Sequence, residues 1–178
     1  MDITAVIPTR GNVDLGVLVE RLRRHKAIQE IIIERGDSVY NRFVGVSRAR
    51  FPVIYTQDDD CLVDIGAIIR AYKPGVVVNA MTEAGAANYP KEETLIGYGA
   101  IFDANLVDVL AGWEKDELFK RECDRVFTSL NEHHTVFPNI QILPCAHDPD
   151  RLYKQDDHYE KVKQIRKRIA EWNSKNKQ

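Results

Sequence analysis

The stretch VIYTQDDDCLVD, residues 53–64, places three aspartates directly after a run of β-branched and aromatic residues. The run at 53–56 predicts a buried strand. In an open α/β sheet, ligands bind beyond the carboxyl ends of the strands, where Asp58, Asp59 and Asp60 would lie. Because side chains two apart share a face of extended chain, Asp58 and Asp60 can point into one space while Asp59 points elsewhere or caps the next helix. Three adjacent like charges indicate a positive partner.

Strands and helices alternate on both sides of this stretch. The predicted strands lie at 3–8, 31–33, 53–56 and 76–78. The predicted helices lie at 13–25, 63–72, 106–113, 119–130 and 159–172. The strands are apolar throughout, which is typical of a mainly parallel sheet with helices on both faces. The sequence therefore predicts an α/β sandwich.

The composition narrows the class of protein. The 178 residues, 44% of them hydrophobic, are enough for one domain with a sizeable core. A net charge of -2 and a pI near 6.2 exclude the global basic field of obligate nucleic-acid or membrane-surface binders. Three cysteines without a CxxC pair argue against a disulfide framework or a structural zinc site, so we expect a reducing, cytoplasmic setting. No apolar run reaches transmembrane length, and no membrane anchor is expected.

Two explanations of the aspartate run are open. Mg²⁺ or Mn²⁺ prefers oxygen ligands and typically takes one or two carboxylates, while substrate phosphates and waters complete its shell. Alternatively, the run is an acidic cap for the helix predicted at 63–72, because carboxylates are favourable at the N-terminal end of the macrodipole. One aspartate is enough for a cap, so three favour the metal.

The order of motifs resembles the GT-A glycosyltransferases, in particular the family 2 and exostosin-like members. A first strand ends in VIPTR, a second reads EIIIERGD, and a third leads into DDD, which matches the DxD motif of these enzymes. LIGYGAIFDANLVDVLAGW is similar to their glycine-containing donor and acceptor segment, and KRECDRVFTSL to their acidic xED helix start. The resemblance implies a Rossmann-like α/β/α sandwich and a compact stand-alone domain, 1–178, of phage or bacterial type. It implies a nucleotide-binding half, a donor and acceptor half, and a C-terminal lid with a helix, at 1–79, 80–150 and 151–178.

In such enzymes the DxD carboxylates hold a divalent metal, Mn²⁺ or Mg²⁺, on the diphosphate of a nucleotide sugar. The resemblance gives this role to Asp58 and Asp60, with Asp60 in direct contact with the metal. Several members add a late histidine, and His147 stands at the matching place, although a loop histidine beside an Asp-Pro turn is the ordinary alternative. Arg151 and Lys154 follow and are expected to close over the diphosphate, where positive groups stabilise developing charge.

The nucleotide-binding candidates that the resemblance implies are Thr9, Arg10, Glu34, Arg48 and Asp58. The first two stand at the end of the first strand, where such enzymes contact the nucleotide. Glu34 ends the second strand, where family 2 members often carry an aspartate for the base. Arg48 is a candidate for contact with nucleotide or phosphate. Arg42 and Arg50 are substitutes for it, and a solvated surface charge is the alternative.

Asp124 matches the xED acid, which implies the general base that deprotonates the acceptor hydroxyl in an inverting transfer. Glu122 is close enough in sequence to contest this role, and a helix-surface carboxylate is the ordinary alternative. A retaining course stays open if Asp124 is not placed for it. The expected donor and acceptor segment includes Gly97, Tyr98 and Gly99.

Together these expectations describe a metal-dependent glycosyltransferase that uses a nucleoside-diphosphate sugar, with a UDP-sugar favoured. Some phage enzymes of this type glycosylate hydroxymethylated bases in DNA. The segment 161–177 is rich in Lys and Arg, so DNA is an open acceptor, although such a run is usually a solvated helix face. A nucleotidyltransferase that makes nucleotide sugars is one alternative, but PTRGN is a short match to its glycine-rich loop. A non-catalytic module that binds nucleotide sugars is the other.

Overall fold

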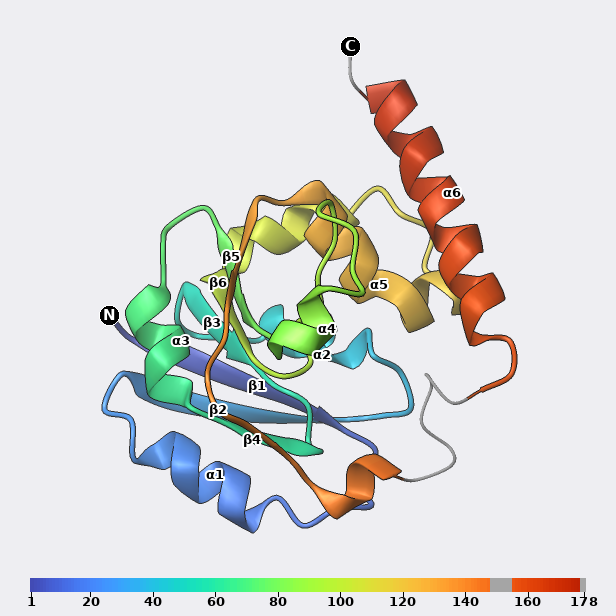
Figure 1. Cartoon of the computed structure of the whole chain (residues 1–178). Coiled ribbons are helices and arrows are strands. Elements are labelled where there is room, and N and C mark those ends of the chain that lie inside the picture. The colour runs from blue at the N-terminus through green and yellow to red at the C-terminus, as the bar shows by residue number, and fades with distance from the viewer. Residues whose placement is uncertain (148–154, 177–178) are drawn as a thin grey trace.

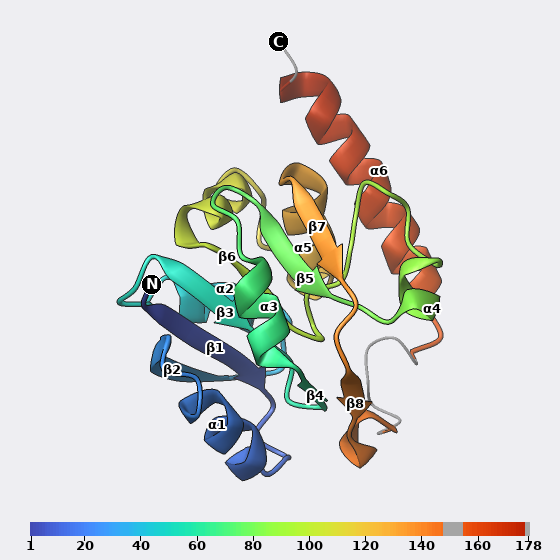
Figure 2. The ribbon, with the colours of Figure 1, turned by 60° about the vertical axis from the view of Figure 1, so that its left-hand side comes forward.

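The computed structural model of the chain describes residues 1–147 and 155–176. Its centre is a six-stranded sheet (Figures 1 and 2). In spatial order the strands are β2 (Ile28–Arg35), β1 (Ile3–Thr9), β3 (Val53–Thr56), β6 (Ala100–Asp103), β5 (Val77–Ala80) and β7 (His133–Val136). β6 runs antiparallel to both of its neighbours, and the other pairs are parallel. The predicted mainly parallel sheet is confirmed.

A smaller antiparallel sheet joins β4 (Cys61–Val63) to β8 (Ile140–Ile142). The α-helices are α1 (Gly16–Arg23), α2 (Asn41–Val46), α3 (Ile65–Ala71), α4 (Glu83–Ala86), α5 (Glu117–Leu130) and α6 (His158–Asn176). Two 3₁₀ helices are η1 (Ala104–Leu110) and η2 (Pro144–His147). β4 and β8 lie beside the carboxyl end of the main sheet, and Ile142 of β8 lines the site described below.

The main sheet has an apolar cluster on each face. β1 is buried along its whole length, and its side chains alternate between the two clusters. Ile3 and Ile7 pack on the face covered by α1 and α3. Val6 packs on the opposite face, which α2, α5 and α6 cover. A sheet buried on both faces needs continuous apolar strands, which explains the sequence pattern and confirms the α/β/α sandwich.

Several predicted helices have different bounds in the structure. Residues 61–63 pair with β8, so the helix predicted at 63–72 begins only at Ile65. The helix predicted at 13–25 is α1, which begins after Leu15; the Asp14 carboxylate accepts a hydrogen bond from the Gly16 N–H at 2.8 Å. The helix predicted at 106–113 is the 3₁₀ helix η1. These bounds depend on strand pairing and on contacts at the helix ends, about which the hydrophobic periodicity of the sequence carries no information.

The C-terminal helix α6 lies against α5, and its far end projects beyond the body of the protein (Figures 1 and 2). Ile165 and Ile169 are buried in the α5 side of the core. The centres of the Trp172 and Trp113 rings are 5.0 Å apart. Trp172 also packs against Gly112, where a Cβ atom would overlap the Trp172 indole. Among the described residues, no helix combines the length and apolar character that a membrane crossing requires.

Candidate active site

A cavity of about 570 Å³ lies at the carboxyl ends of β1 and β3. This is the edge at which α/β sheets bind ligands, and the volume is that of a small-molecule site. Its wall combines segments far apart in the sequence: the ends of β1 and β2, the aspartate run, residues 95–98, the loop at 85–89, α5 and the first residue of α6.

The aspartate run is held in the cavity wall by its neighbours. The Asp58 N–H donates to the Gly97 carbonyl oxygen at 2.7 Å, and the Asp60 carbonyl oxygen accepts from the Leu143 N–H at 2.8 Å. Asp59 is buried, and its carboxylate accepts from the Thr9 hydroxyl at 2.6 Å. The carboxylate of Asp59 is therefore directed at β1, and all three aspartates of the run line the cavity.

The cap of α3 is a different aspartate. Asp64 Oδ1 accepts from the Ala67 N–H at 3.0 Å, which satisfies one of the N–H groups left unpaired at the start of a helix. The alternative prediction that the run at 58–60 caps this helix is therefore wrong, and the presence of three aspartates there has a different explanation.

Arg42 bridges the aspartate run and α5. It comes from α2 and is 1% exposed. Its Nη2 donates to Asp58 Oδ1 at 2.7 Å, and its Nε lies 3.1 Å from Asp124 Oδ1. A buried guanidinium is costly unless carboxylates offset its charge, and here two do. One cation thus fixes the separation between two carboxylates of the cavity that are 66 positions apart in sequence.

Asp124 is a buried carboxylate of the cavity wall. Burial raises the pKa of its carboxyl group to about 7, because the charged form loses hydration; Arg42 opposes this rise, and the negative charges of Asp58 and Glu122 add to it. A carboxylate with a pKa near neutral pH can accept a proton and is partly ionised at pH 7. Asp124 is therefore not a helix-surface carboxylate.

Four further predicted residues lie in the same cavity: Thr9, Arg10, Gly97 and Tyr98. Gly97 carries its backbone against the aspartate run so closely that a Cβ there would overlap Asp58 Oδ2. Gly99 is outside the cavity wall. Its φ of +136° and the Ile68 and Tyr55 side chains beside it explain a glycine at that position.

Glu34 and Arg48 form an ion pair with each other and do not belong to the cavity wall. Arg50 lies 3.9 Å from Glu30. Arg42, Arg48 and Arg50 were the candidates for contact with the nucleotide or phosphate, and of these three only Arg42 lines the cavity. His147 is the last residue of η2, but the structure does not describe its side chain. Arg151 and Lys154 lie outside the described residues.

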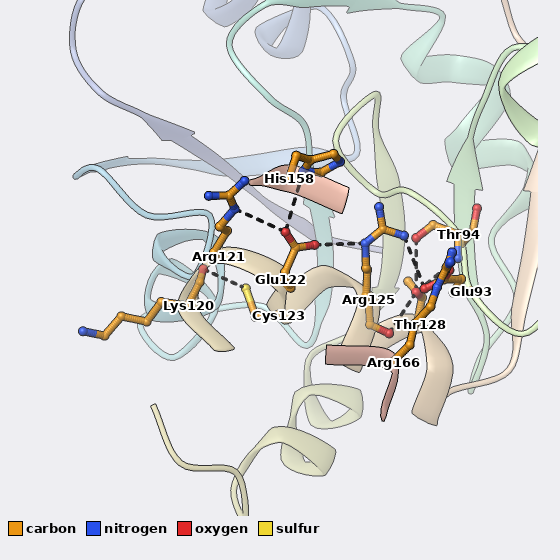
Figure 3. A network of polar contacts seen from close by, with 10 residues as sticks. All are labelled: Glu93, Thr94, Lys120, Arg121, Glu122, Cys123, Arg125, Thr128, His158 and Arg166. Atoms are coloured by element: carbon orange, nitrogen blue, oxygen red, sulfur yellow. Dashed lines mark hydrogen bonds and ion pairs between the residues drawn. The ribbon is translucent and has the colours of Figure 1, made fainter. Parts of the chain in front are cut away.

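A second set of cavity residues was not identified from the sequence: Tyr89, Arg121, Arg125 and His158. Three of them, Arg121, Arg125 and His158, belong to a polar network with Glu122, shown in Figure 3. Arg125 Nε donates to Glu122 Oε2 at 2.9 Å, and the Arg125 guanidinium lies 5.3 Å from the centre of the Tyr89 ring. Because the network joins three separate segments of the chain, no local motif predicts it.

The carboxylates fit a divalent cation that is shared with a substrate. Among the described side chains, no three His, Cys, Asp or Glu residues gather closely enough to hold a metal by themselves. Mg²⁺ and Mn²⁺ in nucleotide sites typically need only one or two carboxylates, since phosphate oxygens and waters provide the other ligands. Asp58 and Asp60 supply such a pair in the cavity.

Comparison with known proteins finds similarity in structure alone. No protein-family model matches the chain, and no curated protein matches it in sequence. A glycosyltransferase involved in the glycosylation of the major capsid of PBCV-1 matches with a TM-score of 0.52 and 14% identity, over 77% of this chain and 82% of that one. The catalytic domain of Drosophila β1,4-galactosyltransferase 7, in complex with xylobiose, matches with a TM-score of 0.51 and 14% identity, over 78% of this chain.

The chain spans 65% of the length of that Drosophila domain. Both similar structures are glycosyltransferases, and at this identity the likeness concerns the fold. The comparisons therefore show that this chain has the GT-A type of glycosyltransferase fold.

Proposed function

We propose that the chain is a glycosyltransferase that depends on a divalent metal and moves a sugar from a nucleoside-diphosphate sugar to an acceptor hydroxyl. One observation carries the proposal: a single cavity contains Asp58, Asp60 and a third carboxyl group, Asp124, whose pKa is raised to about 7. Sugar transfer requires stabilisation of an anionic leaving group and a base for the acceptor. The fold supports the same conclusion.

Asp58 and Asp60 would hold the cation, Mn²⁺ or Mg²⁺, with Asp60 as the more direct ligand. The chemistry that the bound cation would supply is neutralisation of the negative charge on the leaving diphosphate. Arg42 keeps Asp58 in place and opposes its charge. Thr9 holds the aspartate run in place through its hydrogen bond to Asp59. Arg10 lines the cavity and would place a positive charge beside the nucleotide.

Asp124 acts on the acceptor. Its carboxylate removes the proton of the hydroxyl whose oxygen attacks the anomeric carbon, while the bond from that carbon to the diphosphate breaks. Glu122 is less suited to this role, because arginines engage both of its carboxylate oxygens, Arg125 at Oε2 and Arg121 at Oε1. By contrast, the contact of Asp124 with Arg42 is at Oδ1. A base on the acceptor side implies transfer with inversion.

A UDP-sugar is the first donor to test, and DNA with hydroxymethylated bases is one acceptor to test. Exposed lysines on α6, such as Lys167 and Lys175, supply positive charge outside the cavity. Binding through phosphates would weaken steeply with salt, because each neutralised phosphate releases counterions. Salt-insensitive transfer to free sugars would exclude DNA as the acceptor.

The rate should depend on pH through Asp124. The base must be ionised, so we expect kcat/KM to fall by about tenfold per unit as the pH decreases below about 7. The direction follows from the raised pKa, since an ordinary aspartate would stay ionised down to pH 4 or so. Initial rates between pH 5 and 9 measure it. A flat profile from pH 5 to 7 would contradict this role.

The experiment that tests the proposed function is release of nucleoside diphosphate from a donor panel. UDP-glucose, UDP-galactose, UDP-N-acetylglucosamine and GDP-mannose are each incubated with the protein and Mn²⁺, with or without free sugars. We expect release from one donor that stops when EDTA removes the metal. Release that is equal with and without metal would contradict the metal-dependent mechanism.

A further inference from the structure

Helix α5 departs from helical geometry at one residue. Glu122 has φ -114° and ψ 17°, between two helical segments. Sharp irregularities of this kind normally occur at proline or glycine, or where a side chain disturbs the helix, and Glu117–Leu130 contains neither proline nor glycine. The irregular residue is two positions before Asp124, so the backbone at Glu122 decides where the carboxylate of Asp124 points.

The side chain of Glu122 is held from several directions (Figure 3). Its Oε2 accepts from Arg125 Nε at 2.9 Å, and its Oε1 lies 3.4 Å from Arg121 Nε. The same Oε1 lies 3.9 Å from Nδ1 of His158, at the start of α6. Glu122 is only 5% exposed, so its charge depends on these neighbours rather than on water. These contacts converge on the residue at which the backbone is irregular.

Arg125 connects this carboxylate to a second one. Its Nη1 lies 3.3 Å from Oε2 of Glu93, which is 4% exposed. Glu93 Oε1 accepts from Nε of Arg166, on α6, at 2.7 Å. Charges of alternating sign thus run from α6 to the irregular residue of α5. We name this series, Arg166, Glu93, Arg125 and Glu122, the charge relay.

The charge relay is a costly way to attach a helix. Apolar residues of similar volume often stabilise a protein as well as a buried ion pair does, whereas ion pairs fix positions. Unusual backbone conformations also occur preferentially at functional sites. Both observations apply beside Asp124, and α6 has ample apolar contacts of its own through Ile165 and Ile169.

We propose that the charge relay positions Asp124 for catalysis, so that Glu93 and Arg166 control the chemical step from outside the cavity. This inference rests on the proposed function. Without Arg166, the buried Glu93 has Arg125 as its remaining cation in the relay and draws it away from Glu122. The irregular turn then relaxes toward a regular helix, and Asp124 turns away from the acceptor.

Four variants test the proposal: Arg166→Gln, Arg166→Lys, Glu93→Gln and Lys163→Gln. Arg166 has an exposed side-chain fraction of 44%, so its replacement is compatible with folding. The control is Lys163, which pairs with Glu160 outside the relay. With the donor that the wild type uses and Mn²⁺, we expect Arg166→Gln and Glu93→Gln to lower kcat about tenfold or more with donor KM unchanged, since small misplacements are costly in catalysis. Lys at 166 should restore part of the rate.

Equal kcat in Arg166→Gln, Glu93→Gln and the Lys163→Gln control would overturn the inference, as would a change confined to KM. Crystal structures of the wild type and Glu93→Gln provide a test that needs no activity. We expect helical φ and ψ at Glu122 in the variant and a longer distance from Arg42 to Asp124. An unchanged turn would overturn the inference even if the donor panel shows no activity, a result that by itself contradicts only the proposed function.

Discussion

Replacement of Asp124 by Asn should lower the transfer rate about 10³-fold while the donor still binds, because a positioned general base contributes roughly 10²–10⁴-fold. Asn has nearly the same shape but does not accept a proton at neutral pH. The protein should fold, since Asp124 is buried with a pKa raised to about 7 and its neutral form is accessible. Steady-state kinetics with the active donor, and donor affinity by calorimetry, separate the two effects.

The matched control is Glu117→Gln, which changes a carboxylate of the same helix that is 90% exposed and pairs with Lys120. Its rate should equal that of the wild type. The pH dependence below 7 should disappear in Asp124→Asn and persist in the control. A variant Asp124→Asn with more than a tenth of the wild-type rate would contradict the base assignment.

Replacement of Arg42 by Met should destabilise the fold by about 3 kcal/mol or more, because it leaves two carboxylates of a buried site without their cation. Asp124 is almost fully buried, whereas the side chain of Asp58 is 36% exposed and keeps some hydration. Most of the cost should therefore come from Asp124. Urea unfolding at pH 8, where Asp124 would otherwise be ionised, measures the free energy of unfolding.

Two comparisons show whether the loss is electrostatic. Arg48→Met removes an arginine that is 56% exposed and paired with Glu34, and exposed ion pairs contribute about 0–1 kcal/mol. The double variant Arg42→Met/Asp124→Asn removes the charge that Arg42 offsets, so it should be more stable than Arg42→Met alone. Equal stability of Arg42→Met and Arg48→Met would contradict a structural role for the bridge.

The fold was predictable because its sheet is buried on both faces. β1 and β3 are buried along their whole length and mostly apolar, and such strands are recognisable without knowledge of their partners. β6 was not among the predicted strands, and its antiparallel direction was not predictable, since direction depends on how the chain returns through residues 81–99. The short strand β4 was also missed, because its partner β8 lies almost 80 residues away.

The candidate site divides in the same way. Asp58, Asp60 and Asp124 stand in local patterns, and the structure brings all three to one cavity. In the sequence Arg48 was the candidate and Arg42 only a substitute for it, and only tertiary contacts distinguish Arg42. Tyr89 and His158 could not be predicted as cavity residues, because the residues they contact belong to another segment, α5. The residues whose roles depend on long-range contacts are therefore the ones that could not be predicted from the sequence.

The central claim is a nucleotide site that needs both metal and the aspartate run. Thermal unfolding is measured with UDP, GDP, TDP and CDP, each with and without Mn²⁺, for the wild type, Asp60→Ala and Asp64→Asn. Asp64→Asn is the matched control, since Asn is a good helix cap and Asp64 lies outside the cavity wall. Bound ligand raises the midpoint temperature by linkage. We expect a rise with one nucleotide that requires Mn²⁺, is lost in Asp60→Ala and is kept in Asp64→Asn. A rise that is the same in Asp60→Ala, or no rise with any nucleotide, would contradict the central claim.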